Sequence, residues 1–402
     1  MKAKDYLITN FRITGFTDLN KDKSKIEYIG VGDKGKITYI GKERPDSAFS
    51  QKIDLKGAFL SPGWIDLHTH IYEVSDIAVA PDRVGPAAGV VLPVDAGTAG
   101  EASFSGLKKY VIEPNDFPIK AYLNIGSTEI IAASRVSEIA NIGCININKT
   151  INCIEKNKNI IKGIKVRASS SIVKSFGIKA VKLAKKVSRI ANLPLIVHTG
   201  EPPVFVEDLI KELDQGDMIT HCFNGKSGYN LLQDKTNIKY LNMAREKGIL
   251  LDIGHGSASY SQKVAEKAFS IGIHPYSIST DIHKTNINGP VWGLAETMSK
   301  IMELGYNYEE IIKKVTGNPA DFLKLEKWTC LEKGQPAYFT AFTIKDGKFP
   351  VEDSAARGEV TTAGSRERNK FKLNKLISPV FSFYKKNLVE AESNYIKNRE
   401  EK

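Results

Sequence analysis

Short apolar runs recur along most of this chain, and each run ends in glycine or in polar residues. These runs occupy residues 58–70, 89–97, 119–127, 161–169, 193–200, 217–224, 248–256 and 276–283. Helical patterns separate several of them, as in residues 171–192 and 260–272. Continuous apolar runs are typical of strands buried on both faces, and their alternation with helices is typical of parallel sheets. The eight runs therefore predict an α/β fold, a parallel (β/α)8 TIM barrel ringed by helices.

The two ends of the chain have a different pattern, with strands and turns but little helical period. Residues 1–57 contain short strand patterns, and Gly-Asp-Lys-Gly at 32–35 is the signal of a hairpin turn. Strand character returns near the C-terminus, so the two ends are predicted to form one small β-sandwich module. The predicted organisation is a first part of this module at 1–57, the barrel at 58–325, the second part at 326–383 and a charged tail at 384–402.

Composition narrows the class of protein. The chain has 402 residues, of which 42% are hydrophobic and 26% are charged, as expected for a globular protein. The net charge is +11, but the lysines are spread along amphipathic helices, so no nucleic-acid partner is predicted. No stretch reaches the roughly 18 apolar residues of a membrane span, no signal peptide is visible, and the four cysteines lack a CxxC spacing. We therefore expect a cytoplasmic protein without a disulfide framework or a membrane partner, and a homo-oligomer stays open.

Side chains suited to metal binding or catalysis follow several of the predicted strands. Two of the seven histidines, His68 and His70, end the first run, and on a strand both point to the same side. Further candidates end later runs, namely Lys165, His198, His221, His255 and Asp281. The carboxyl ends of all strands of a parallel barrel open onto one mouth. The sequence therefore predicts that these side chains converge at that mouth.

Such a set could hold a pair of divalent metal ions. Imidazole and carboxylate groups are ligands of zinc, and two ions roughly 3.5–4 Å apart activate water near neutral pH. A single histidine at a strand end is more often structural, but four histidines with a lysine and an aspartate favour a metal centre. Lys165 is placed to bridge the ions, although a strand lysine also commonly extends to solvent. We expect zinc, while manganese or iron could occupy the same set.

The ordered motifs of the chain resemble the amidohydrolase superfamily, in particular its deacetylase branch, which is often called dihydroorotase-like. The resemblance rests on H-x-H at His68 and His70, on GIKVRAS, VHTGEPP, THCFNGK and STDIH, and on the turns DAGTAG, DIGHG and TGNPA. It extends from Tyr6 to about Asp353. The resemblance implies that Lys165 is carboxylated by CO2 and that this carbamate bridges two metal ions.

The resemblance also implies which residues hold each ion. One ion would be bound by His68, His70, Lys165 and Asp281, and the other by Lys165, His198 and His221. Asp281 would in addition move the proton during hydrolysis of an amide or ester carbonyl. No Walker A motif, dinucleotide-binding GxGxxG or GxSxG elbow supports another chemistry. The chain is therefore predicted to be a binuclear metal-dependent hydrolase.

The substrate is predicted from one position where the chain departs from its nearest resemblance. Dihydroorotases carry an arginine two residues after the second histidine, where Tyr72 stands here. We therefore expect a deacetylase of N-acetyl amino acids or acetylated hydroxy acids, which means a small and anionic substrate. Dihydroorotase or another cyclic amidase is the alternative, and a non-catalytic binding protein of the same fold is the second alternative.

Two further residues are candidates for substrate contacts. Arg167 shares the strand face of Lys165 and could hold a substrate carboxylate through two hydrogen bonds, or form an ion pair with a neighbouring acid. His255 could contact the substrate or form a hydrogen bond within the mouth. Asp66 could accept a hydrogen bond from a ligand imidazole, or be an ordinary strand carboxylate.

Overall fold

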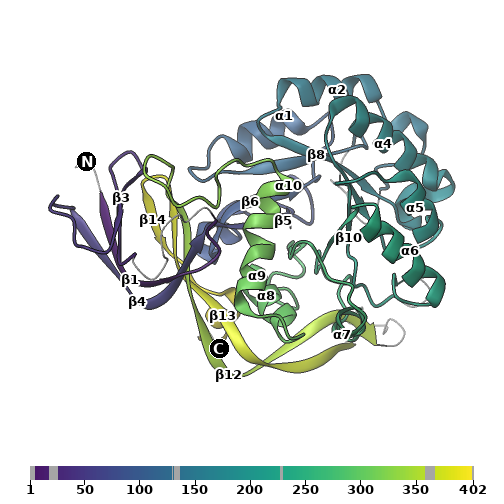
Figure 1. Ribbon diagram of the computed structural model, residues 1–402. Helices are drawn as coiled ribbons and strands as arrows, with labels where there is room; N and C mark the ends of the chain where they lie inside the picture. The colour runs from purple at the N-terminus through teal and green to yellow at the C-terminus, as the bar shows by residue number, and fades with distance from the viewer. Residues whose placement is uncertain are drawn as a thin grey trace.

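The computed structural model describes residues 5–17, 26–128, 130, 136–226, 230–357 and 367–400, which form two separate sheets (Figure 1). One is a curled parallel sheet of seven strands, in the order β11-β10-β9-β8-β7-β6-β5. Its strands are β5 (Trp64–Thr69), β6 (Val90–Ala96), β7 (Lys120–Asn124), β8 (Ile161–Arg167), β9 (Leu195–His198), β10 (Met218–Thr220) and β11 (Leu250–Asp252). Seven of the eight predicted runs are therefore confirmed as strands of one parallel sheet.

The eighth run, residues 276–283, is not a strand, so the prediction of eight strands is wrong at this point. The run lies between β11 and β5 and forms only single bridges to them, at Ser277 and at Ile282. Part of the backbone bonds to side chains and not to a neighbouring strand: the backbone N–H of Thr280 donates to the carboxylate of Asp66 at 3.1 Å. Asp281 also has a left-handed backbone, at φ +48°, which interrupts an extended segment.

Helices follow or precede most strands of the curled sheet. They are α1 (Phe104–Leu107), α2 (Ile147–Lys156), α3 (Ser170–Val173), α4 (Ile178–Ala191), α5 (Val206–Glu212), α6 (Lys235–Glu246), α7 (Gln262–Ser270), α8 (Leu294–Met302), α9 (Tyr308–Val315), α10 (Gly317–Phe322) and α11 (Asn394–Glu400). Shorter turns are η2 (Pro81–Arg83), η3 (Pro86–Ala88), the π-helical η4 (Lys108–Ile112), η5 (Ile142–Cys144) and η6 (Lys174–Phe176). The helix predicted at 171–192 is divided, because Gly177 has φ +52° and separates η6 from α4. Among the described helices, none has both the length and the apolar character needed to cross a membrane.

The second sheet is mixed and takes strands from both ends of the chain. Its order is β14-β13-β12-β4-β1-β2-β3. The strands are β1 (Tyr6–Ile13), β2 (Tyr28–Val31), β3 (Ile37–Gly41), β4 (Gln51–Pro62), β12 (Tyr338–Arg357), β13 (Glu367–Tyr384) and β14 (Asn387–Glu390). β4 pairs with β12, which confirms that the two ends build one β unit, and this unit is a single sheet where a sandwich was predicted. The hairpin predicted at 32–35 joins β2 to β3, as expected.

β12 and β13 are much longer than the other strands and form an antiparallel hairpin. The hairpin leaves the mixed sheet, passes α8 and reaches α7 (Figure 1). Two hydrogen bonds secure this path, from Ile377 N–H to the Ser299 hydroxyl on α8 at 2.9 Å and from Gln262 N–H on α7 to Asp353 at 3.1 Å. The β12–β13 hairpin therefore connects the mixed sheet to helices α7 and α8 beside the curled sheet.

β5 does not alternate regularly toward its carboxyl end. Its pairing with β6 shifts register between Trp64 and Ile65 and again between Asp66 and Thr69. Ile65 and Leu67 belong to a buried apolar cluster that includes Ile196 of β9 and Phe322 of α10. Because Ile196 pairs with Lys165 of β8, and paired residues share a face of the sheet, this cluster lies on the same face as Lys165.

Candidate metal centre

The four histidines predicted as metal ligands lie side by side at the carboxyl ends of their strands. His68 and His70 end β5, His198 ends β9 and His221 follows β10. The ring centres of His68 and His70 are 5.5 Å apart, and those of His68 and His221 are 5.2 Å apart. His198 continues the row, with its ring centre 4.3 Å from that of His221. Strands far apart in the sequence thus bring four imidazoles together.

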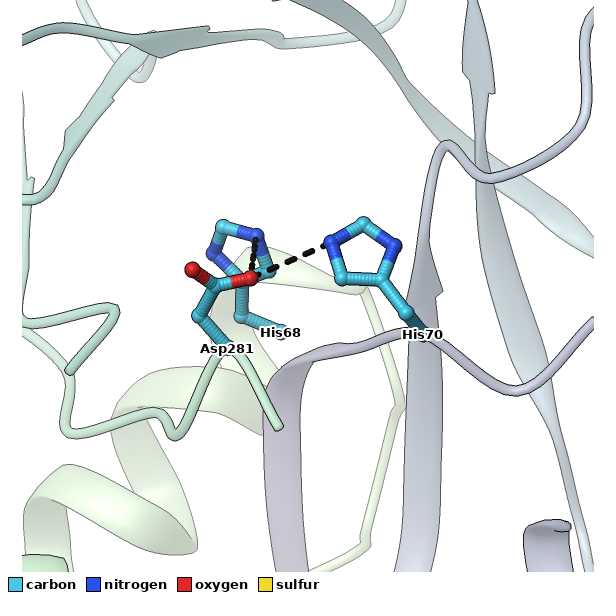
Figure 2. Close-up of side chains that lie close together, drawn as sticks. All are labelled: His68, His70 and Asp281. Carbon is cyan, nitrogen blue, oxygen red and sulfur yellow. Dashed lines mark ion pairs between the residues drawn. The ribbon is translucent and has the colours of Figure 1, made fainter. Parts of the chain in front are cut away.

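Asp281 and Lys165 complete the cluster. Oδ1 of Asp281 lies 3.3 Å from Nε2 of His68 and 3.1 Å from Nε2 of His70, as Figure 2 shows. Nζ of Lys165 lies 3.3 Å from the same Nε2 of His68. The ligand atoms of His68, His70 and Asp281 are all within 4.8 Å of one another, which makes them a candidate metal site.

Hydrogen bonds to the other ring nitrogen fix the tautomer of His68. Thr220 Oγ1 donates to a carboxylate oxygen of Asp252 at 2.8 Å, and it lies 3.2 Å from Nδ1 of His68. Because the hydroxyl proton is committed to Asp252, Thr220 can only accept from His68, so Nδ1 carries the imidazole proton. Nε2 therefore keeps its lone pair, which is the form of histidine that binds a metal.

His221 and His70 are held in a similar way. Nδ1 of His221 lies 2.7 Å from the carbonyl oxygen of Gly254, which can only accept, so this nitrogen also carries the proton. Nε2 of His221 is buried and has no hydrogen-bond partner among the described residues. Nδ1 of His70 lies 2.8 Å from the hydroxyl of Thr98. A buried imidazole nitrogen with a free lone pair, facing other histidines, is what a metal ligand requires.

Burial sets the protonation states of the cluster. Burial, followed by the charge of Lys165, lowers the pKa of His68 well below its usual value, and burial lowers the pKa of His221 to about 4. Burial also lowers the pKa of Lys165 to about 8. For Asp281, burial alone would raise the pKa, but the neighbouring His68 and a hydrogen bond from His70 outweigh it and hold the pKa well below its usual value. The cluster thus combines neutral His68 and His221 with an ionised Asp281 carboxylate.

Two members of the cluster have a strained backbone. His221 has φ +66° and Asp281 has φ +48°, a left-handed conformation that is uncommon outside glycine. Such residues persist only where the surrounding structure holds them, and they concentrate at functional sites. Close packing restrains His221. Gly254 lies so near to its ring that a Cβ added to this glycine would be only 2.8 Å from Nδ1 of His221.

Arg167, Asp66 and His255 have contacts within the protein that bear on the alternatives predicted for them. Arg167 forms the ion pair, with Nε 2.6 Å and Nη2 2.8 Å from the two oxygens of Glu138, so this edge of the guanidinium is already engaged. Asp66 accepts from Thr280 and from the backbone N–H of His68, not from a ligand imidazole.

His255 forms hydrogen bonds within the fold, the second of the two alternatives for this residue. Its ring is fully buried, with Nε2 2.9 Å from Nζ of Lys300 and Nδ1 3.0 Å from the carbonyl oxygen of Gly256. Both ring nitrogens of His255 therefore have partners within the protein.

Sequence reasoning missed the residues that orient the ligands. Thr220 directly precedes His221, and Asp252 is a carboxylate in the middle of an apolar strand run, so a search for buried polar strand residues could have found both. Glu138 lies in an irregular segment 29 residues before Arg167, and no local signal marks it.

Comparisons with known proteins agree with this geometry. No family model matches the sequence. A deacetylase of Agrobacterium fabrum is 43% identical over 349 residues, which cover 87% of this chain and 85% of that protein. A deacetylase of Brucella anthropi is 42% identical over 382 residues, which cover 95% of this chain and 92% of that protein.

Solved structures extend the similarity to the whole fold. The crystal structure of a dihydroorotase matches with a TM-score of 0.88 at 39% sequence identity, covering 97% of this chain and 98% of that chain. The crystal structure of an adenine deaminase matches with a TM-score of 0.83 at 29% identity, covering 96% of this chain and 100% of that one. Identity above 40% over most of both chains decides the family. This chain belongs to the deacetylases of the amidohydrolase superfamily and is an amidohydrolase.

Proposed function

We propose that this enzyme is a binuclear metal-dependent deacetylase that releases acetate from N-acetyl amino acids or acetylated hydroxy acids. The observation that carries the proposal is the cluster itself, in which ligand atoms of His68, His70 and Asp281 meet within 4.8 Å beside Lys165 and His221. The reaction class follows from the deacetylase relatives.

The donor set fits two divalent ions, and zinc suits its mixture of imidazole and carboxylate groups. His68, His70 and Asp281 would hold one ion, His198 and His221 would hold the other, and Lys165 would contribute to both. The unpartnered Nε2 of His221 supports this assignment, because a buried nitrogen with a free lone pair needs a partner. Divalent ions in such a site polarise a carbonyl oxygen and lower the pKa of water.

Lys165 would serve as a bridging ligand through a carbamate. Its neutral amine adds to CO2, which forms a carbon–nitrogen bond, releases a proton and leaves a carboxylate-like group with two oxygens. Burial favours the neutral amine by lowering the pKa of Lys165 to about 8. The nitrogen also lies next to His68 at the centre of the cluster, where a bridging group is required.

Asp281 would move the proton. Its carboxylate accepts a proton from the attacking water, which then adds to the acetyl carbonyl, and it passes the proton to the leaving nitrogen or oxygen as the bond to the acetyl carbon breaks. The low pKa of Asp281, held down mainly by His68 against the effect of burial, keeps the carboxylate in the accepting form. Its side chain is 13% exposed, more than those of His68 and His70, so it faces the open side of the cluster.

An anionic substrate suits the charges around His198. Burial lowers the pKa of His198 well below its usual value, and the neighbouring cations Arg167, Lys165 and Lys226 lower it further. Lys226 is the most accessible of these cations, with a side chain that is 26% exposed and paired with Glu201 at 2.9 Å. A carboxylate on the substrate would therefore be attracted to this side of the cluster.

Tyr72 argues against the cyclic amidase alternative. It stands where dihydroorotases carry an arginine, and it is buried in the apolar core with its hydroxyl against Gly106. A site without that arginine lacks a charge-assisted contact of roughly 1.5–3 kcal/mol to a substrate carboxylate. This corresponds to a loss of roughly 10- to 150-fold in binding for dihydroorotate.

Substrate screening tests the proposal. Protein supplied with zinc and bicarbonate is assayed for acetate release from N-acetyl-D- and N-acetyl-L-amino acids and from acetylated hydroxy acids, and for ring opening of dihydroorotate. We expect acetate release from at least one acetylated acid and little or no turnover of dihydroorotate. Lys226→Met should raise KM for an acidic substrate more than for its neutral amide, and efficient dihydroorotate hydrolysis would refute the assignment.

A further inference from the structure

The segment after β11, residues 253–261, forms a wall beside Asp281. Gly256 lies in this segment at φ +55°, and a Cβ on it would lie 2.5 Å from Oδ2 of Asp281. Its backbone N–H donates to the carbonyl oxygen of Thr280 at 2.9 Å, directly before Asp281. The position of the wall therefore limits how far the Asp281 carboxylate can turn.

β12, from the hairpin at the C-terminal end of the chain, holds the other side of the wall. Oγ of Ser354 accepts hydrogen bonds from the N–H groups of Ser259 and Tyr260, at 3.0 and 2.8 Å. The same hydroxyl donates to the carbonyl oxygen of His255 at 3.0 Å. Ser354 is only 2% exposed, so one buried hydroxyl satisfies three backbone groups of the wall.

Lys300 of α8 supports the wall from a second direction. Its Nζ lies 2.9 Å from Nε2 of His255 and 2.6 Å from the carbonyl oxygen of Pro290. The carbonyl oxygen of Gly256 can only accept, so Nδ1 of His255 donates to it and Nε2 accepts from Lys300. The ring of His255 also stacks on Tyr260, with ring centres 4.7 Å apart. His255 is therefore fixed at both nitrogens and on one face.

We propose that Ser354 is a positioning residue for the reaction, acting through residues 253–261 on Asp281. The hairpin holds the wall against the carboxylate, and the wall keeps Oδ1 of Asp281 directed at His68 and His70. The inference rests on the proposed role of Asp281. By this inference the β12–β13 hairpin, which belongs to the mixed sheet, helps to position a catalytic residue at the edge of the curled sheet.

The test compares two serine-to-alanine variants of the same hairpin. Ser354→Ala removes the hydroxyl that forms hydrogen bonds with three backbone groups of residues 253–261. Ser382→Ala removes an equally buried hydroxyl on β13 that has no hydrogen-bond partner among the described residues, so it is the matched control. We expect Ser354→Ala to lower kcat about tenfold with KM within about twofold, because small displacements of a catalytic group cost up to about 100-fold. Ser382→Ala should keep the kcat of the original protein.

Hydrogen–deuterium exchange of the two proteins separates this inference from the proposed function. Ser354→Ala should speed amide exchange in residues 253–261, while its melting temperature should stay near that of Ser382→Ala. Neither measurement requires a substrate. Unchanged exchange in that segment, or equal losses of kcat in both variants, would overturn the inference. Faster exchange in a protein that releases no acetate would leave the wall confirmed and refute the proposed deacetylase activity instead.

Discussion

Nζ of Lys165 lies 3.3 Å from Nε2 of His68, and both side chains are almost completely buried. Two basic groups this close cannot both carry a proton at low cost, and burial disfavours each charge. Burial, with the Lys165 charge second, holds the pKa of His68 well below its usual value. A neutral amine beside a neutral imidazole is suited to CO2 addition and to metal binding, which gives the first prediction.

Lys165→Ala should abolish the bridge. We expect the metal content to fall and kcat to drop by more than about 100-fold, since even indirect disturbance of metal ligands costs 10- to 100-fold. Elemental analysis and acetate release measure the two effects, and short carboxylic acids with bicarbonate should restore part of the activity. Lys162→Ala, on the same strand but partly exposed, is the control and should keep both properties. Full activity of Lys165→Ala with two bound ions would contradict the carbamate.

His198→Ala should remove a ligand of the second ion without unfolding the protein. We expect bound metal to fall from about two ions per chain to about one, with loss of turnover. His274→Ala is the matched control, because His274 lies outside the cluster with Nδ1 2.5 Å from the hydroxyl of Tyr306. Elemental analysis of both purified variants, beside thermal unfolding curves, checks the expectation. Equal metal content in the two variants would exclude His198 as a ligand.

Glu138→Gln should destabilise the protein strongly. The carboxylate is buried and holds Arg167 through two short hydrogen bonds, so its loss leaves a cation unpaired in a largely buried position. Such a change costs about 3 kcal/mol of unfolding free energy. Urea denaturation at pH 7 measures it, and Glu207→Gln, which breaks the exposed pair with Lys211, should cost less than about 1 kcal/mol. Similar midpoints for the two variants would show that Arg167 gains other partners.

Lys300 should make the stability of the protein depend on pH. Burial lowers the pKa of Lys300 from 10.5 to about 7 in the folded state. Between these values the unfolded chain binds a proton that the folded chain does not, so stability should rise as pH increases, by up to about 1.4 kcal/mol per pH unit. Lys300→Met removes this term and should flatten the curve of unfolding free energy between pH 7 and 10. Parallel curves for the two proteins would show that Lys300 stays protonated in the fold.

The convergence of the histidines with Lys165 and Asp281 could be predicted from the sequence because most of these residues follow a simple rule. His68, His198 and His221 each end an apolar run, and the ends of parallel strands meet at one edge of a sheet. Lys165 follows the same rule, and Asp281 joins the cluster although its run is not a strand of the sheet. The position of a residue at the end of a run was therefore enough to predict its place in the cluster, although these residues are far apart in the sequence.

Contacts made by irregular segments could not be predicted in this way. The hydroxyl of Ser354 binds Ser259 across 95 residues, and neither position stands out from its neighbours in the sequence. The prediction of a strand at residues 276–283 was wrong for a related reason. Thr280 donates hydrogen bonds to the side chain of Asp66, whereas a strand residue would donate to the backbone of the neighbouring strand. Such pairings depend on the assembled fold and leave no periodic signal.

The pairing of β4 with β12 has a consequence for synthesis of the chain. Ser61 of β4 binds Thr340 of β12 across 279 residues, so at about 5–20 residues per second β4 waits roughly 15–55 s for its partner to be made. During that interval one edge of β4 is unpaired and open to strands of other chains. Lys52, Asp54 and Lys56 give the first half of β4 alternating charges, which disfavour such pairing. The apolar second half, Ala58 to Leu60, has no such protection, and a ribosome pause that lengthens the interval should favour aggregation of the nascent chain.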